Sequence, residues 1–551
     1  MSIIRVNQLK YKYPDSDALA IDDLSFTVEK GEFIGITGMN TAGKSTLCYA
    51  LCGLVPHFFK GGYGGTVTID GMDVLTHELS EITSKVGLVF ENPFSQMTGA
   101  KFTVYDEIAF GLENMGLPRE EIHKRISDTM KMLGIEKLKD ENPFSLSGGQ
   151  MQRVAIASVI AMKPAILILD EPTSQLDPEG TEEVFRIVDM LSKRGMTVIM
   201  IEQKLERLAE YANRIILMHE GKIIHDGLPA EVFSRENLFE YGIQPPLYVK
   251  IAKALNIQDA QTGLYPVKLQ DMHVDRKLSF SIQAARSINY KTVKIDVHNL
   301  HFSYNEGIDI IKGMNVTLEG EPIAIIGQNG AGKSTFVKLL KKLLNPNAGE
   351  ILLDGHTISK RTAAKLAGRI GLVSQNPNDQ IFKNNVLDEV LFGPLTIGQS
   401  KEVATTNALA MLELVGLSEK TDENPYDLSL AERKMVAIAS ILAMDTDVVI
   451  FDEPTMGQDY LGKLKVKEII HSLYEQGKLV ICILHDMDFV AEVFDRTIIF
   501  SNGNILFDGP TRVAFSNKAI LHQARVEQPH LTKFVGKLGY EEIILDVNEL
   551  K

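Results

Sequence analysis

The chain has 551 residues, which is too many for a single hydrophobic core, so we expect several domains. A net charge of −15 argues against a general nucleic-acid binder, and three cysteines exclude a disulfide framework and fit a reducing cytosol. No apolar run approaches the roughly 20 residues that cross a bilayer, and the N-terminal "MSIIRVNQLK" lacks the apolar stretch of a secretory signal.

Four stretches of the first half return in the same order in the second half, which indicates a duplication. "GITGMNTAGKSTL" from Gly35 returns as "AIIGQNGAGKSTF" from Ala324, and "VGLVFENPFSQMTG" returns as "IGLVSQNPNDQIFK". "AILILDEPTSQLD" returns as "VVIFDEPTMGQD", and "TVIMIEQKLE" returns as "LVICILHDMD". We therefore expect two homologous domains, 1–260 and 294–551, each ending in a helical element. Residues 261–293 have no counterpart and are expected to form a partly ordered linker.

Short apolar runs alternate with amphipathic stretches in each half. "AILIL" before Asp170 and "VVIF" before Asp452 are typical of buried parallel strands. This pattern predicts an α/β fold with a mainly parallel sheet and helices on both faces.

Each half contains one match to G-x-x-x-x-G-K-[ST], placed after an apolar strand and at the start of a helix. The backbone N–H groups of such a loop bind phosphate oxygens, the lysine reaches the β- and γ-phosphates, and the serine is a ligand of Mg²⁺. Two matches in this context predict two ATP–Mg²⁺ sites. The candidate residues are Gly38, Asn40, Thr41, Ala42, Gly43, Lys44, Ser45 and Thr46, and Gly327, Asn329, Gly330, Ala331, Gly332, Lys333, Ser334 and Thr335.

Paired carboxylates end the two apolar strands. Asp170 and Asp452 are candidates to hold Mg²⁺ as the Walker B aspartate does, whereas Glu171 and Glu453 are candidates to orient and deprotonate the attacking water. The alternative is a strand-end salt bridge, which the neighbouring motifs disfavour.

The segment Leu146 to Gln150 reads "LSGGQ". Together with the two P-loops, the carboxylate pairs, Gln375 of a Q-loop and His485 downstream, it resembles the ATP-binding cassette (ABC) ATPases. The resemblance implies two tandem ABC domains, each with a helical subdomain, that pair head to tail. Ser147, Gly148, Gly149 and Gln150 would then meet the nucleotide held by the other domain, with Gln375 near the metal and His485 as the switch histidine. Tyr13 and Tyr304 match the aromatic residue that stacks on adenine, although each is also compatible with a sheet-edge aromatic.

The departures from this family pattern sort into one composite site. Glu91 replaces the Q-loop glutamine, Gln203 replaces the switch histidine, and Leu428 to Glu432 read "LSLAE" instead of "LSGGQ". All three would surround the nucleotide of Lys44, and Glu432 and Glu91 would place carboxylates near its phosphates. The other site keeps Gln375, Glu453 and His485. We expect the first site to bind ATP and hydrolyse it poorly, and the second to perform most of the turnover; neutral drift is the alternative.

The segments after both Q-loops, together with "GLVPHFFKGGYGG" and the "QPPL" and "QPHL" elements, resemble the energy-coupling factor (ECF) ATPases. That resemblance implies a bacterial importer of a vitamin or transition metal, with a transmembrane T component and a substrate-capturing S component as partners. The chain would lie at the cytoplasmic face of the membrane without binding nucleic acid. A thiamine precursor as substrate is only a family association. A soluble tandem ABC protein acting on ribosomes is the main alternative, although its usual linker is longer and more basic. A fused sugar-importer ATPase is a third option, although its second P-loop is usually eroded.

Overall fold

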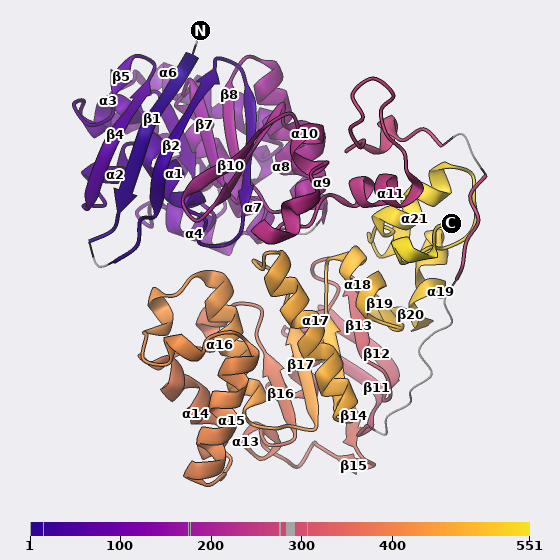
Figure 1. The fold of residues 1–551 in the computed structure, drawn as a ribbon. Coiled ribbons are helices and arrows are strands. Elements are labelled where there is room, and N and C mark those ends of the chain that lie inside the picture. Colours follow the sequence, from indigo (N-terminus) through magenta and orange to yellow (C-terminus); the bar gives the residue numbers. More distant parts are fainter. Residues whose placement is uncertain are drawn as a thin grey trace. The chain divides into compact units, whose positions relative to one another are not determined.

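The computed structural model describes residues 2–14, 16–174, 176, 178–274, 277–282, 292–305 and 307–551. The chain divides into two compact units, residues 1–274 (unit 1) and 275–551 (unit 2), which are described separately. Figure 1 draws unit 1 in indigo to magenta and unit 2 in salmon to yellow. None of the helices in the described ranges is both long and apolar enough to cross a membrane.

Unit 1 contains a four-stranded antiparallel sheet and a six-stranded, mainly parallel sheet, in which only the β9–β10 pair is antiparallel. The first sheet has the order β2-β1-β4-β5, with β1 Ser2–Lys12, β2 Ile21–Glu29, β4 Gly62–Ile69 and β5 Met72–Asp73. The second has the order β10-β9-β3-β8-β7-β6, with β3 Phe33–Gly38, β6 Val86–Val89, β7 Ile166–Asp170, β8 Thr197–Ile201, β9 Arg214–His219 and β10 Lys222–Gly227.

The central strands of the six-stranded sheet are covered on both faces, as their uninterrupted apolar runs predict. In β7, Ile166 and Ile168 belong to the core shared with the antiparallel sheet, whereas Leu167 and Leu169 belong to the core under the helices. The helices are α1 Lys44–Leu51, α2 Leu54–His57, α3 Leu79–Thr83, α4 Pro93–Gln96, α5 Val104–Asn114, α6 Arg119–Leu133, α7 Gly148–Ala161, α8 Pro178–Lys193, α9 Leu205–Tyr211, α10 Pro229–Phe233 and α11 Leu247–Leu255. Helices α5, α6 and α7 pack against one another and form the helical subdomain.

Unit 2 repeats this architecture. Its antiparallel sheet has the order β12-β11-β14-β15, with β11 Ile295–Ser303, β12 Asp309–Leu318, β14 Ala348–Leu353 and β15 His356–Thr357. Its mainly parallel sheet has the order β16-β17-β18-β13-β19-β20, with β13 Ile323–Gly327, β16 Ile370–Val373, β17 Val448–Asp452, β18 Leu479–Ile483, β19 Arg496–Ser501 and β20 Asn504–Pro510. The predicted α/β fold of two tandem domains is confirmed.

The helices of unit 2 again include a subdomain of three packed helices, α14, α15 and α16 (Figure 1). The set is α12 Lys333–Leu340, α13 Ala363–Leu366, α14 Val386–Thr396, α15 Lys401–Leu414, α16 Leu430–Leu442, α17 Tyr460–Glu475, α18 Met487–Val493, α19 Thr511–Ser516, α20 Lys518–Gln523 and α21 His530–Lys537. Short 3₁₀ turns occur at Glu136–Leu138, Pro143–Ser145, Glu236–Tyr241, Leu269–Asp271, Pro377–Asp379, Ser418–Lys420, Pro425–Asp427 and Val547–Glu549.

The segment expected to be a linker contributes to both units. Val267 is buried in the core of unit 1, and Tyr265 N–H donates to the Ser234 hydroxyl. In unit 2, Ser279 exchanges backbone hydrogen bonds with Lys551, and Phe280 forms a β-bridge with Leu550. Residues 283–291 lie outside the described part of the chain.

Candidate nucleotide-binding sites

The P-loop of unit 1 joins β3 to α1 through backbone conformations that require glycine. Gly38 has φ 153°, and a Cβ added there would lie 2.2 Å from the Met218 carbonyl oxygen. Gly43, at φ 92°, caps the N-terminus of α1. The Lys44 ammonium is buried and donates to the carbonyls of Gly38 at 3.0 Å and Met39 at 2.8 Å. The loop is therefore wrapped around its lysine, with the helix N-terminus beside it as an anion site.

The P-loop of unit 2 has the same geometry between β13 and α12. Gly327 has φ 148°, and an added Cβ would lie 2.3 Å from the Phe500 carbonyl oxygen. The Lys333 ammonium donates to the carbonyls of Gly327 at 2.6 Å and Gln328 at 2.9 Å. Both predicted loops therefore have the form that cradles phosphate.

One difference between the P-loops escaped the sequence analysis. Thr41 has φ 66°, in the left-handed region, where unit 2 has Gly330 at φ 76°. A β-branched residue rarely adopts this conformation, which costs of order 1–3 kcal/mol. Aligning the two halves residue by residue would have shown the exchange, because glycine is the residue that such a position favours.

The serine and aspartate candidates for Mg²⁺ meet in both units. The Ser45 hydroxyl hydrogen-bonds to Asp170, and Ser334 hydrogen-bonds to Asp452. Burial raises the pKa of both aspartates, with the Glu453 charge adding to the effect at Asp452. Among the described residues, one buried oxygen of each aspartate, Oδ1, has no hydrogen-bond partner. Hard oxygen ligands with spare lone pairs suit Mg²⁺, so these two pairs would hold the ion, which neutralises phosphate charge when bound.

The glutamates after β7 and β17 have left-handed backbones that turn their side chains at the strand ends. Glu171 has φ 44° and Glu453 has φ 53°, and their N–H groups donate to the carbonyls of Ile201 and Ile483. Such strained conformations are commonly kept at functional sites. The position of Glu171 and Glu453 at the strand ends is compatible with their predicted role in orienting the attacking water.

In unit 1, Glu171 is held by an amide. Gln203 Nε2 donates to Glu171 at 2.9 Å and to Asn40 Oδ1 at 2.8 Å, and Lys44 Nζ lies 3.8 Å from the same carboxylate oxygen. Burial raises the pKa of Glu171 to about 7, against the opposing effects of Lys44 and Gln203. The carboxyl is therefore partly protonated near neutral pH.

In unit 2, Glu453 faces an imidazole. His485 Nε2 lies 3.0 Å from Oε1 of Glu453. Burial acts to raise the pKa of Glu453, but the close contact with His485 and the charges of Lys333 and Lys434 outweigh it, and the pKa lies below its usual value. Glu453 is therefore ionised at neutral pH and ready to accept a proton.

The two signature segments both begin a helix with a capping box. Ser147 caps α7, with its N–H bonded to Gln150 Oε1 at 3.0 Å, and Ser429 caps α16, with its N–H bonded to Glu432 Oε2 at 3.0 Å. In α16 the Ser429 hydroxyl also donates to Glu432 at 2.8 Å. Lys420 Nζ donates to the other Glu432 oxygen at 2.7 Å.

These contacts change the expected role of Glu432. The sequence predicts a carboxylate near the phosphates, and the structure pairs this carboxylate with Lys420 and Ser429 of its own unit. Burial acts to raise its pKa, but these partners outweigh it and lower the pKa. Ser429 is thus occupied inside unit 2, whereas Leu430 and Ala431 add side chains where α7 has two glycines.

The Q-loop residues Glu91 and Gln375 follow β6 and β16. Gln375 is exposed, and its amide lies against Met456 Sδ at 3.9 Å. Glu91 is half-buried. The metal role of Gln375 stays a prediction.

The two candidate adenine-stacking tyrosines lie beside the P-loops. Tyr13 hydroxyl is 3.1 Å from Thr46 Oγ1, and Tyr304 hydroxyl is 3.3 Å from Thr335 Oγ1. Tyr304 is 57% exposed, whereas Tyr13 is half-buried and packs edge-on against Tyr11 and Phe59, at ring centroid distances of 4.8 and 6.3 Å. Phe59 belongs to the insertion "PHFFKGGYGG" of unit 1 and also stacks on Tyr49 at 5.2 Å.

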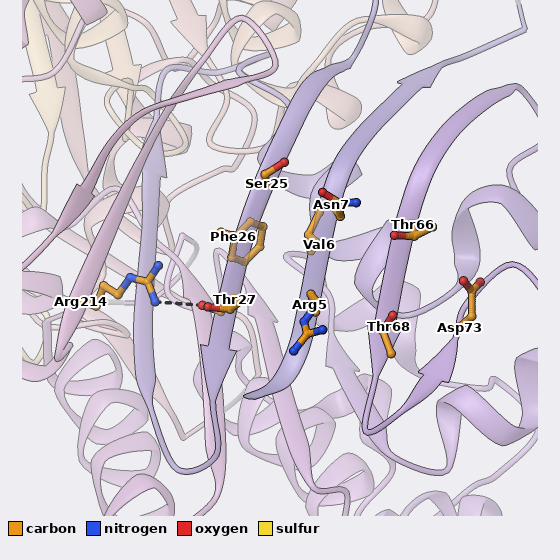
Figure 2. Close-up of a pocket in the computed structure, with 10 residues that line it drawn as sticks. All are labelled: Arg5, Val6, Asn7, Ser25, Phe26, Thr27, Thr66, Thr68, Asp73 and Arg214. Atoms are coloured by element: carbon orange, nitrogen blue, oxygen red, sulfur yellow. Dashed lines mark hydrogen bonds between the residues drawn. The ribbon is translucent and has the colours of Figure 1, made fainter. Parts of the chain in front are cut away.

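A hollow of about 750 Å³ lies elsewhere, on the outer face of the antiparallel sheet of unit 1. Figure 2 shows its polar lining from β1, β2 and β4, with Arg214 donating to the Thr27 carbonyl. Its lining residues are Arg5, Val6, Asn7, Ser25, Phe26, Thr27, Thr66, Thr68, Asp73 and Arg214, none of which is a predicted site residue. This hollow is therefore not the nucleotide site.

Comparisons with known proteins show the family. The family model described as "ABC transporter" matches twice, over residues 21–174 and 311–456. The chain belongs to the ABC transporter family. It is 37% identical over 573 residues to a relative from Methanosarcina mazei named as an ABC transporter ATP-binding protein, covering 100% of this chain and 97% of the relative. A relative of the same name from Caldanaerobacter subterraneus subsp. tengcongensis is 36% identical, with 99% and 98% covered.

Among solved structures, this ABC protein is similar to cbiO1 from Clostridium perfringens, which is described as part of the ABC transporter complex cbiONQ. The identity is 34%, the match covers 43% of this chain and 93% of that one, and the TM-score is 0.39. Family membership establishes the chain as an ATP-binding ABC ATPase subunit of a transporter, with two ABC domains in one polypeptide.

Proposed function

We propose that this ABC ATPase energises an ECF-type importer of a vitamin or metal micronutrient, bound at the cytoplasmic face of the membrane through a T component and working with an S component. The segments after the two Q-loops support this assignment. Glu107 is buried and accepts hydrogen bonds from the N–H and hydroxyl of Thr98, both at 2.8 Å. Glu389 is buried in the same way and accepts from the N–H groups of Phe382 and Lys383.

These braced loops present apolar side chains to solvent, which supports their role in partner binding. Phe102 is 77% exposed beside Glu107, and Phe382 is 54% exposed beside Glu389. Phe382 packs edge-on against the exposed Phe392, and Lys383 lies over both rings. Exposed aromatic clusters of this kind are typical of protein-binding surfaces.

We further propose that the two ATP sites work unequally. One would combine the P-loop of Lys333 with the signature of α7 and hydrolyse ATP with Mg²⁺; the other would combine the P-loop of Lys44 with the signature of α16 and mainly hold ATP. The contact between Glu453 and His485 carries this proposal. At the same position in unit 1, Gln203 gives Glu171 a neutral amide, which supplies a hydrogen bond but no positive charge.

The unequal sites are tested by Glu453→Gln and its matched variant Glu171→Gln in the full-length chain. We expect Glu453→Gln to lose most ATP turnover, on the order of 10²-fold or more, because the base is removed. Glu171→Gln should keep a large part of it. Equal losses from the two variants would contradict the asymmetry.

The importer assignment is tested through the partners. A tagged chain purified from solubilised membranes should carry integral membrane proteins in fixed stoichiometry, and the reconstituted complex should take up its substrate only with ATP. Loss of this association in a Phe102→Ser and Phe382→Ser double variant would support the proposed binding surface. Co-purification of ribosomal proteins instead would favour the soluble alternative and overturn the importer.

A further inference from the structure

A buried lysine joins three segments of unit 2. Lys434 is 2% exposed and lies on the second turn of α16, two residues after Glu432. Its ammonium donates to the backbone carbonyls of Ser374 at 2.9 Å, Gln375 at 2.6 Å and Asp452 at 3.3 Å. These carbonyls come from the Q-loop and from the end of β17.

The geometry uses the whole hydrogen-bonding capacity of the side chain. An ammonium has three N–H donors and no acceptor, and three carbonyls face it here. A buried charge is expensive unless it is fully hydrogen-bonded, so a plain packing role would be better served by an apolar residue. Burial lowers the pKa of Lys434 to about 8, with the charges of Asp452 and Glu453 acting in the opposite direction. The group therefore carries its charge at neutral pH.

Unit 1 provides an internal comparison. Gln152 occupies the equivalent position on α7, also two residues after the signature, and is 1% exposed. Its Nε2 has no hydrogen-bond partner among the described residues. The tether between the signature helix, the Q-loop and the Walker B strand is thus present in unit 2, where Gln375 and the Glu453–His485 pair also occur.

We propose that Lys434 is a positioning residue for ATP hydrolysis in unit 2: its ammonium fixes the backbone at Gln375 and Asp452, so that both side chains reach the metal in register. Lys434 acts through these two residues and does not itself touch ATP. The Gln375 side chain is exposed in this structure and projects from the backbone that Lys434 holds. Preorganised support of this kind lowers the cost of assembling a site. The inference rests on the proposed roles of Gln375 and Asp452 at Mg²⁺.

The test compares Lys434→Gln and Lys434→Met in the full-length chain. Lys434→Gln introduces the residue of the other half and keeps one donor group, whereas Lys434→Met keeps the length and removes all donors. ATP turnover is measured against Mg²⁺ concentration, and ATP binding is measured separately in EDTA. Gln152→Met is the matched control, because Gln152 Nε2 has no hydrogen-bond partner among the described residues.

We expect Lys434→Met to raise the Mg²⁺ concentration for half-maximal turnover by roughly tenfold and to lower kcat by a similar factor, with a smaller change for Lys434→Gln. The ATP affinity of Lys434→Met in EDTA should stay unchanged. Gln152→Met should keep the wild-type Mg²⁺ requirement and the wild-type kcat. A wild-type Mg²⁺ requirement in Lys434→Met would overturn the proposal, as would a loss of ATP affinity in EDTA as large as the loss of turnover, which marks a structural role. Glu453→Gln, measured in parallel, separates a failure of the Lys434 proposal from a failure of the proposed function. If Glu453→Gln is inactive while Lys434→Met is normal, only the role of Lys434 fails. If Glu453→Gln is fully active, the proposed function fails.

Discussion

The Lys420 ammonium lies 2.7 Å from the Glu432 carboxylate, at the two positions that Leu138 and Gln150 occupy in the first half. A neutral pair in one signature segment is therefore a charged pair in the other. The charge of Glu432 is balanced inside its own unit, and the same carboxylate accepts the Ser429 hydroxyl. The altered segment is a helix cap whose serine hydroxyl and carboxylate are paired inside unit 2.

A double-mutant cycle tests this pairing. Lys420→Leu alone should destabilise unit 2 by about 1 kcal/mol, because it leaves a half-buried carboxylate without its cation. Combined with Glu432→Gln, it should cost less than the sum of the single changes, with a coupling of roughly 0.5–1 kcal/mol. Denaturant unfolding measures both, and the exposed Lys465–Glu468 pair on α17 serves as control, with little coupling. Additive single effects would contradict the pairing.

Repairing the altered signature should not by itself create a second fast site. In a Glu453→Gln background, the changes Leu430→Gly, Ala431→Gly and Glu432→Gln should recover little ATP turnover. The proposed site would still contain Glu91 and Gln203, and catalytic groups that act as a unit are not additive. Adding Glu91→Gln and Gln203→His should recover much more. Near wild-type turnover from the signature repair alone would show that Glu91 and Gln203 do not limit this site.

The aromatic packing around Tyr13 predicts a difference in nucleotide affinity. Phe59→Ala removes one of the two rings that hold Tyr13 edge-on. Because such a contact contributes about 0.5–1.5 kcal/mol, ATP binding at the P-loop of Lys44 should weaken by roughly 2- to 10-fold. The measurement uses a Lys333→Ala background, which silences the other P-loop. Phe102→Ala is the control and should leave the affinity for ATP unchanged. If Phe59→Ala also leaves the affinity unchanged, the segment that contains Phe59 does not contribute to nucleotide binding.

The stability of unit 2 should depend on pH through Lys341. Burial lowers the pKa of Lys341 to about 8 from its ordinary 10.5. The unfolded state then binds more protons than the folded state between these values, so the contribution to stability rises as pH rises from about 8 to 10.5. For this half-buried group the rise should reach up to about 2 kcal/mol after allowance for solvent screening.

Lys341→Met removes this dependence. The free energies of unfolding of wild type and variant, measured at pH 7.5, 9 and 10, should approach each other as pH rises, with the variant more stable at the low end. A difference that stays constant across this range would contradict the assigned burial. In unit 1 the equivalent position is the buried Cys52, so Lys341→Cys offers a second variant with a residue that the fold already accepts.

The sequence predicted the features that depend on a local pattern of residues. Gly38, Lys44 and Asp170 are identified by their place between an apolar strand and a helix, and the structure puts them there. It did not predict contacts made by residues distant along the chain. Lys434 meets Ser374 and Gln375 only because α16 packs beside β16, and the Lys420 partner becomes visible only when the turn before α16 is built. The exposure of the Gln375 side chain depends on its rotamer and on the loop around it, and a sequence motif does not specify either.

The single amide group of Gln203, donating to both Asn40 and Glu171, joins the P-loop, the switch position and the strand-end glutamate of unit 1. These two hydrogen bonds restrict the rotation of the Gln203, Asn40 and Glu171 side chains, which would otherwise lose this freedom when nucleotide binds. The entropy is lost during folding, and binding benefits from it. The same rigidity does not speed up turnover, because the products must still leave the site after hydrolysis. Under the proposed unequal sites, we therefore expect the nucleotide of this half to stay bound longer than that of unit 2.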